Sequence, residues 1–157
     1  MIFGKRLSEY LAFERALMAL VAVVGLLRLS LSLVGLPNAA VTFLSTNVVL
    51  WAGALYLGAA VHTRGFGSYR QVLPLVFFPL AVGQSVAILG ILLSIAGFPN
   101  IYTAPEYSGP IPAPNHWIHL LAHLTIGMVV PPFLLWGAAS LVMRVTKGVT
   151  RRRTAVA

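Results

Sequence analysis

The sequence predicts an all-α integral membrane protein, with four antiparallel transmembrane helices in one bundle that occupies residues 1–157 and both termini in the cytoplasm. Hydrophobic residues make up 59% of the 157 residues and charged residues only 9%, whereas soluble domains contain about 25% charged residues. The apolar residues form long runs that can each cross a hydrocarbon core of about 30 Å. Basic residues flank these runs, as membrane proteins require.

The first two spans are expected at residues 16–36 and 39–61. Residues 5–15 precede them and mix both charge signs with Leu, Tyr and Phe, which is typical of a lead-in at the membrane interface. The turn at residues 35–38 is short and uncharged. We therefore expect the second span to return beside the first.

The last two spans are expected at residues 72–97 and 116–142. Proline removes a backbone donor, so Pro79 and the Pro131–Pro132 pair should bend these helices. The loop at residues 98–114 is rich in proline, which argues against helix there. A basic tail at residues 143–157 ends the chain.

The basic residues also predict orientation. All of the eleven Lys and Arg residues except Arg28 lie before the first span, in the loop after the second span or in the tail. The positive-inside rule places these segments in the cytoplasm and the proline-rich loop outside. We expect a multi-pass protein of the cell inner membrane that contacts lipids, including anionic headgroups at the cytoplasmic face. The tail lacks interleaved aromatic residues, so nucleic acid is not an expected partner.

Three of the four histidines, His116, His119 and His123, lie at the start of the fourth span. At about 100° per residue they share one helical face. Neutral imidazoles at this spacing are candidate ligands for a transition metal, and one is a candidate axial ligand for haem b. Because the three extend about 10 Å along the helix, at most two adjacent ones would share an ion. The alternative is that His116 anchors the interface while His119 and His123 form hydrogen bonds across helices.

Other polar residues are expected at the same membrane depth as the histidines of the fourth span. Arg28 and His123 each lie about 12 Å from the outer ends of their spans, and Asn47 lies at a similar depth. A buried arginine is costly unless acceptors surround it. We therefore predict an outward-facing polar pocket whose ligand- or cofactor-binding residues are Arg28, Asn47, His119 and His123.

Several kinds of chemistry are missing. The chain has no cysteine, which removes disulfides and thiolate metal ligands. No nucleophile elbow, HExxH pattern or carboxylate pair is present. The expected spans contain no acidic residue, which argues against a proton-coupled pump.

The favoured function is therefore a non-catalytic subunit, anchor or assembly partner built around the polar pocket. Small residues in the spans, including Gly53, Gly83 and Gly90, predict close packing in a homo-oligomer or a larger membrane complex. One alternative is a haem- or metal-binding redox protein that uses His119 and His123. Another is a membrane enzyme that binds a lipid or a quinone.

Overall fold

A computed structural model describes residues 1–103 and 115–156, and this part of the chain is helical without β-strands. Four segments are long and apolar enough to cross a membrane: Leu7–Leu33, Asn38–Thr63, Tyr69–Ile95 and Ile126–Arg152. The prediction of an all-α chain with four candidate membrane spans is thus confirmed. The helices are α1 (Leu7–Leu33), α2 (Asn38–Val41), α3 (Thr46–Thr63), α4 (Tyr69–Ile95), the 3-10 helix η1 (Ile101–Thr103), α5 (His116–Leu124) and α6 (Ile126–Val156).

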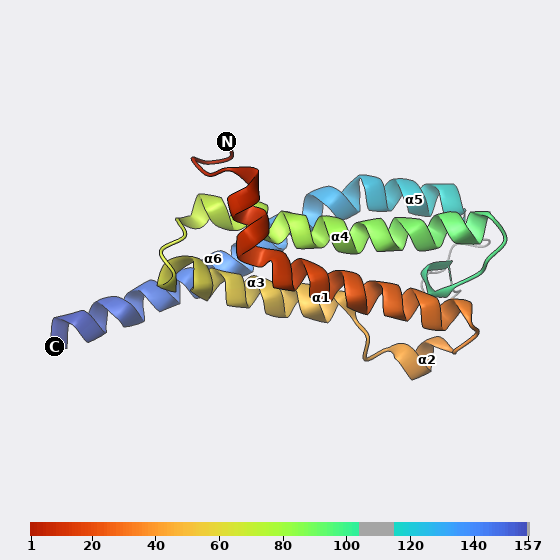
Figure 1. The fold of residues 1–157 in the computed structure, drawn as a ribbon, viewed down its shortest axis with the longest axis horizontal. Coiled ribbons are helices and arrows are strands. Elements are labelled where there is room, and N and C mark those ends of the chain that lie inside the picture. The colour runs from red at the N-terminus through yellow and green to blue at the C-terminus, as the bar shows by residue number, and fades with distance from the viewer. Residues whose placement is uncertain (104–114, 157) are drawn as a thin grey trace.

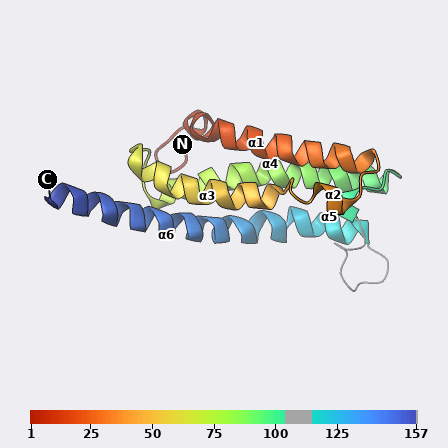
Figure 2. The same ribbon diagram turned by 90° about the horizontal axis from the view of Figure 1, so that it is seen from below.

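The long helices lie side by side, and the two termini lie towards the same end of the molecule (Figure 1). The α2 and η1 segments lie towards the opposite end (Figure 1). Helix α6 follows α3 along the bundle and extends past it at the C-terminus (Figure 2). Helix α4 is central, because it packs against α1, α3, α5 and α6.

Helix α1 begins at Leu7, so the expected interfacial lead-in is already helical. Glu9 closes the first turn, because its carboxylate accepts a hydrogen bond of 2.7 Å from the backbone nitrogen of Arg6. The early start places Glu14 inside a candidate span. The expectation that the spans contain no acidic residue is therefore wrong for α1, where Glu14 is only 2% exposed.

The second expected span is interrupted. Residues 42–45 separate α2 from α3, and the Ser45 hydroxyl caps α3 by accepting a hydrogen bond from the Val48 nitrogen. The third span is one helix, with Pro74 and Pro79 inside α4.

The fourth expected span divides at Thr125, between α5 and α6, while Pro131 and Pro132 lie inside α6. Thr125 has φ −109° and ψ −82°, outside the helical region. Pro131 has no N–H to donate to the carbonyl of Gly127, four residues earlier. That carbonyl instead accepts a hydrogen bond of 3.2 Å from Gln84 Nε2 of α4. The proline is thus accommodated by a neighbouring helix.

The glycines of the expected small-residue seam face neighbours within the same chain. A Cβ at Gly53 would lie 2.6 Å from Leu17, and a Cβ at Gly83 would lie 3.4 Å from Val21. A Cβ at Gly90 would collide with the ring of Tyr102. These glycines therefore let the helices and η1 approach one another, so a second copy is not needed to explain them.

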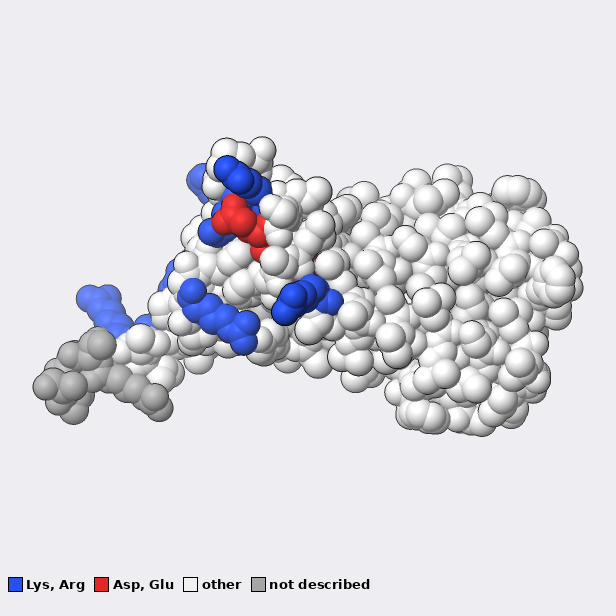
Figure 3. All heavy atoms as spheres, in the orientation of Figure 1, with Lys and Arg blue, Asp and Glu red and all other residues white. Residues whose placement is uncertain are grey.

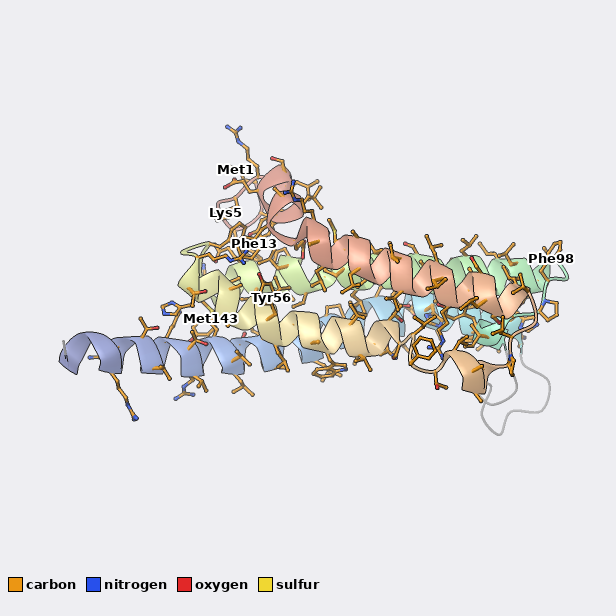
Figure 4. The ribbon with its side chains drawn as sticks, turned by 60° about the horizontal axis from the view of Figure 1, so that its bottom comes forward. Met1, Lys5, Phe13, Tyr56, Phe98 and Met143 are labelled. Carbon is orange, nitrogen blue, oxygen red and sulfur yellow. The ribbon has the colours of Figure 1, made fainter. Side chains whose placement is uncertain are left out.

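Basic residues gather at the end that carries the termini, and the opposite end shows no Lys or Arg on the face drawn (Figure 3). Several lie over aromatic rings at distances typical of cation–π contacts. Lys5 Nζ lies 4.6 Å from the Phe66 ring centroid, and Lys147 Nζ lies 4.2 Å from that of Tyr69. Arg64 Cζ lies 5.7 Å from the ring centroid of Phe13 and 5.6 Å from that of Tyr56. We call Lys5, Arg64, Lys147 and these four rings the cationic collar; Lys5, Phe13 and Tyr56 are labelled near this end in Figure 4.

Candidate functional site

A cavity of about 200 Å³ lies near the other end of the bundle, between α1, α3, α4, α5 and η1. Its apolar wall includes Leu50, Leu80, Ala87 and Ile101. Seven polar side chains from the five elements also line it: Arg28, Thr46, Asn47, Gln84, Tyr102, His119 and His123. We call this space the polar cavity.

The four residues predicted to form a pocket, Arg28, Asn47, His119 and His123, all line the polar cavity. The structure thus brings together residues that the sequence places at one depth on three different spans. That they bind a ligand or cofactor stays a prediction. His62, the remaining histidine, lies in the last turn of α3 next to Arg64 of the collar.

Sequence reasoning missed Gln84 and Tyr102. Gln84 is the single strongly polar residue near the middle of α4, and this isolation within an apolar run is the signal that points to it. Tyr102 belongs to a segment that was expected to lie outside the membrane. No comparable signal in the sequence predicts that η1 folds back onto α4.

A hydrogen-bond network places Tyr102 in the cavity. The Asn100 amide donates a bond of 2.7 Å to the carbonyl oxygen of Gly90, and its own carbonyl oxygen accepts one of 3.1 Å from the Tyr102 nitrogen. The Ile101 nitrogen donates to the Ser32 hydroxyl at 2.7 Å, which ties η1 to α1. Burial raises the pKa of Tyr102, while the charge of Arg28 acts in the opposite direction. A phenol hydroxyl is protonated at neutral pH even at its ordinary pKa, so that of Tyr102 can donate a hydrogen bond.

Arg28 is the charged residue of the polar cavity. Its Nη2 donates a hydrogen bond of 3.0 Å to Asn38 Oδ1, which joins α1 to the start of α2. A guanidinium carries five N–H donors. Asn38 is an acceptor for one of these donors.

The two cavity histidines are joined to α4. His123 Nδ1 lies 2.5 Å from Gln84 Oε1, and His123 Nε2 lies 3.2 Å from His119 Nε2. Since the Gln84 amide nitrogen donates to Gly127, its oxygen is the atom that faces His123. An amide oxygen only accepts, so Nδ1 of His123 carries the proton and its Nε2 holds a lone pair.

The structure does not support the predicted three-ligand metal site at His116, His119 and His123. Within the described ranges, no three His, Cys, Asp or Glu side chains come together around a common point. Positions i, i+3 and i+7 extend about 10 Å along a helix, so the first and last rings cannot converge. His116 does not line the cavity, and its Nδ1 is buried without a hydrogen-bond partner in the part of the chain that is described.

Comparison with known proteins returns no match to this chain, whether against family models, curated proteins or solved structures.

Proposed function

We propose that this chain is a non-catalytic membrane protein, a subunit, anchor or assembly partner, whose polar cavity binds a small molecule with oxygen acceptors. The observation that carries the proposal is the convergence of seven polar side chains from five elements on one cavity. Polar groups inside a membrane bundle are costly and usually mark a binding site or a pathway. Arg28, Asn47, His119 and His123 are the proposed binding residues, with Gln84 and Tyr102 added from the structure.

The proposed topology has four antiparallel spans with both termini in the cytoplasm of a cell with an inner membrane. Its support is the gathering of basic side chains at the end that carries the termini (Figure 3). The polar cavity then opens in the outer half of the membrane. The collar lies at the cytoplasmic face, where anionic headgroups are the proposed lipid partners. Association into an oligomer or a larger complex stays a prediction. The small residues no longer support it, because they pack against neighbours within one chain.

The cavity volume limits the ligand. At about 30 Å³ per water, 200 Å³ corresponds to about seven waters. Pockets for drug-sized ligands measure roughly 300–1,000 Å³, so the polar cavity suits a smaller ligand. Small carboxylates and carbonyl compounds fit.

A quinone is the second candidate, because an apolar groove of about 380 Å³ lies between α4 and α6. Phe77 lines that groove and Gln84 lines the cavity. Seven residues apart, they lie on the same face of α4. The ring of a quinone would occupy the cavity while its tail follows the groove.

Thermal unfolding of the purified protein in detergent tests the proposal, with benzoate, benzamide and a decyl-substituted benzoquinone as probes. A ligand at about 100 times its Kd stabilises the folded state by about 2.7 kcal/mol, which raises the midpoint by roughly 5–10 °C. We expect benzoate to stabilise the wild type more than benzamide does, because Arg28 faces the ligand. Stabilisation by the quinone alone would select the second candidate.

Ala87→Leu fills the cavity and should abolish the benzoate shift. Ser85→Leu is the matched control, since Ser85 is an exposed residue of the same helix that does not line the cavity. Absence of a shift with all three probes, or an unchanged benzoate shift in a folded Ala87→Leu protein, would refute the proposal.

A further inference from the structure

We infer that His119 and His123 form a two-ligand site for one divalent transition-metal ion in the polar cavity. This inference rests on the proposed function, because it names a ligand for the same cavity. It differs from the three-histidine prediction in leaving His116 out and in giving two residues outside α5, Gln84 and Pro131, a positioning role.

The first step concerns Pro131. A helical residue at this position normally donates its N–H to the carbonyl four residues earlier, which here is Gly127. Proline lacks that N–H, so the Gly127 carbonyl is available to the Gln84 amide nitrogen, 3.2 Å away. Gly127 also gives the amide room, because a Cβ there would lie only 3.1 Å from both terminal atoms of Gln84.

The second step concerns the orientation of His123. With its nitrogen on Gly127, Gln84 presents its oxygen to His123 Nδ1. This contact fixes the ring and leaves the Nε2 lone pair directed at His119. Metal-bound histidines usually donate their other ring N–H to an oxygen in this way.

The third step is the separation of the two candidate ligand atoms. Two nitrogens bound to one tetrahedral ion, with bonds of about 2.0–2.1 Å, lie about 3.3–3.4 Å apart. The Nε2 atoms of His119 and His123 lie 3.2 Å apart. Without an ion this distance is that of a single N–H···N hydrogen bond in which His119 Nε2 is the donor. To bind a metal, His119 moves that proton to its Nδ1 or releases it to water, so that both Nε2 atoms present a lone pair.

His119 and His123 both line the polar cavity, so an ion held between them could take further ligands from it. Two imidazoles are fewer than the three protein ligands of most catalytic zinc sites, so we expect an exchangeable ion that completes its shell with water or a ligand oxygen. A carboxylate bound in the same cavity can supply an oxygen ligand to the ion, so metal and benzoate should each raise the affinity for the other by the same factor.

The experiment uses the full chain in detergent, treated with EDTA, dialysed and titrated with CoCl2 by calorimetry and visible absorption. We expect one Co²⁺ per chain with the absorption of a low-coordinate site, and tighter binding when benzoate is present. His123→Ala should abolish binding. His116→Ala and His62→Ala are the matched controls and should bind Co²⁺ as tightly as the wild type.

The positioning residues are tested separately. Gln84→Leu should weaken Co²⁺ binding by about 10–100-fold, the usual effect of removing a partner that orients a ligand. Pro131→Ala restores the N–H that competes for Gly127, so it should weaken Co²⁺ binding in the same direction without lowering thermal stability. If Pro131 had a purely structural role, Pro131→Ala would leave the Co²⁺ affinity unchanged.

Three results would overturn the inference: no Co²⁺ binding by folded wild-type protein, equal losses in His116→Ala and His123→Ala, or undiminished binding in His123→Ala. Benzoate binding in the same EDTA-treated sample separates the two proposals. If benzoate binds and Co²⁺ does not, the metal inference alone fails. If Co²⁺ does not bind and none of benzoate, benzamide and the quinone raises the unfolding midpoint, the proposed function fails with it.

Discussion

The contact between α3 and α6 at Gly58 gives a prediction that depends on packing alone. A Cβ at Gly58 would collide with the carbonyl oxygen of Ala139, and it would lie 2.9 Å from the Ala139 carbonyl carbon and 3.0 Å from its Cα. Carbon atoms in contact normally lie about 3.5–4.0 Å apart. Because the obstacle is backbone, no side-chain rotation can relieve it. Gly58→Ala must therefore move the helices apart by about half an ångström or more.

Overpacking of this kind costs about 1–3 kcal/mol. For a chain of this size, a loss of about 2 kcal/mol lowers the unfolding midpoint by roughly 4–8 °C. Gly137→Ala is the matched control, because it lies two residues from Ala139 on the same helix and a Cβ there meets nothing within 4 Å. The stability of the control should be unchanged or should rise by up to about 1 kcal/mol, because alanine has a higher helix propensity than glycine.

Thermal unfolding of both purified variants in the same detergent measures the difference. If Gly58→Ala unfolds at the wild-type midpoint or above it, the close approach of α3 and α6 is refuted. If the unfolding midpoints of Gly58→Ala and Gly137→Ala fall by the same amount, the loss comes from glycine replacement in general. The argument from the contact with Ala139 is then wrong.

Three further predictions follow from other parts of the chain. Asn100→Ala removes the amide that ties η1 to Gly90, so it should lose about 1–3 kcal/mol of stability and weaken benzoate binding through displacement of Tyr102; unfolding with and without benzoate checks both effects. Glu14→Leu replaces a buried carboxyl that has no hydrogen-bond partner among the described residues, so it should raise the unfolding midpoint, and a lower midpoint would show that Glu14 has a partner. The chain has no cysteine, so a single introduced cysteine reports topology directly. A membrane-impermeant maleimide should label Leu36→Cys in intact cells and Val149→Cys only after permeabilisation. The reverse labelling pattern would show that the proposed orientation is inverted.

The spans were predictable because the length of an apolar run and its flanking charges reflect the bilayer. Helix ends were less predictable, because they depend on local hydrogen bonds. Glu9 extends α1 by capping its first turn, and this extension brings Glu14 into the helix. Ser45 starts α3 and so separates it from α2.

The polar cavity was partly predictable for a similar reason. A constant rise of 1.5 Å per residue converts position in a span into depth, which brought Arg28, Asn47 and His123 to one level. The depth of a residue does not show which face of its helix it lies on or which neighbouring helix it contacts. The bond between Gln84 and Gly127 joins residues 43 positions apart, and it depends on a proline whose expected effect was only a bend.

The cationic collar has a consequence for the position of the bundle in the membrane. In the proposed topology the contacts of Lys5, Arg64 and Lys147 with aromatic rings lie at the cytoplasmic face, where sliding the bundle would bury a cation or expose an aromatic ring. Arg64 follows Asn47 by 17 positions, a rise of about 26 Å at 1.5 Å per residue, nearly the thickness of the hydrocarbon core of about 30 Å. In the proposed topology, the distance from the collar to Asn47 sets how close the cavity mouth lies to the outer headgroups. A thicker bilayer would draw that mouth into the lipid tails, so access to the cavity should depend on membrane thickness.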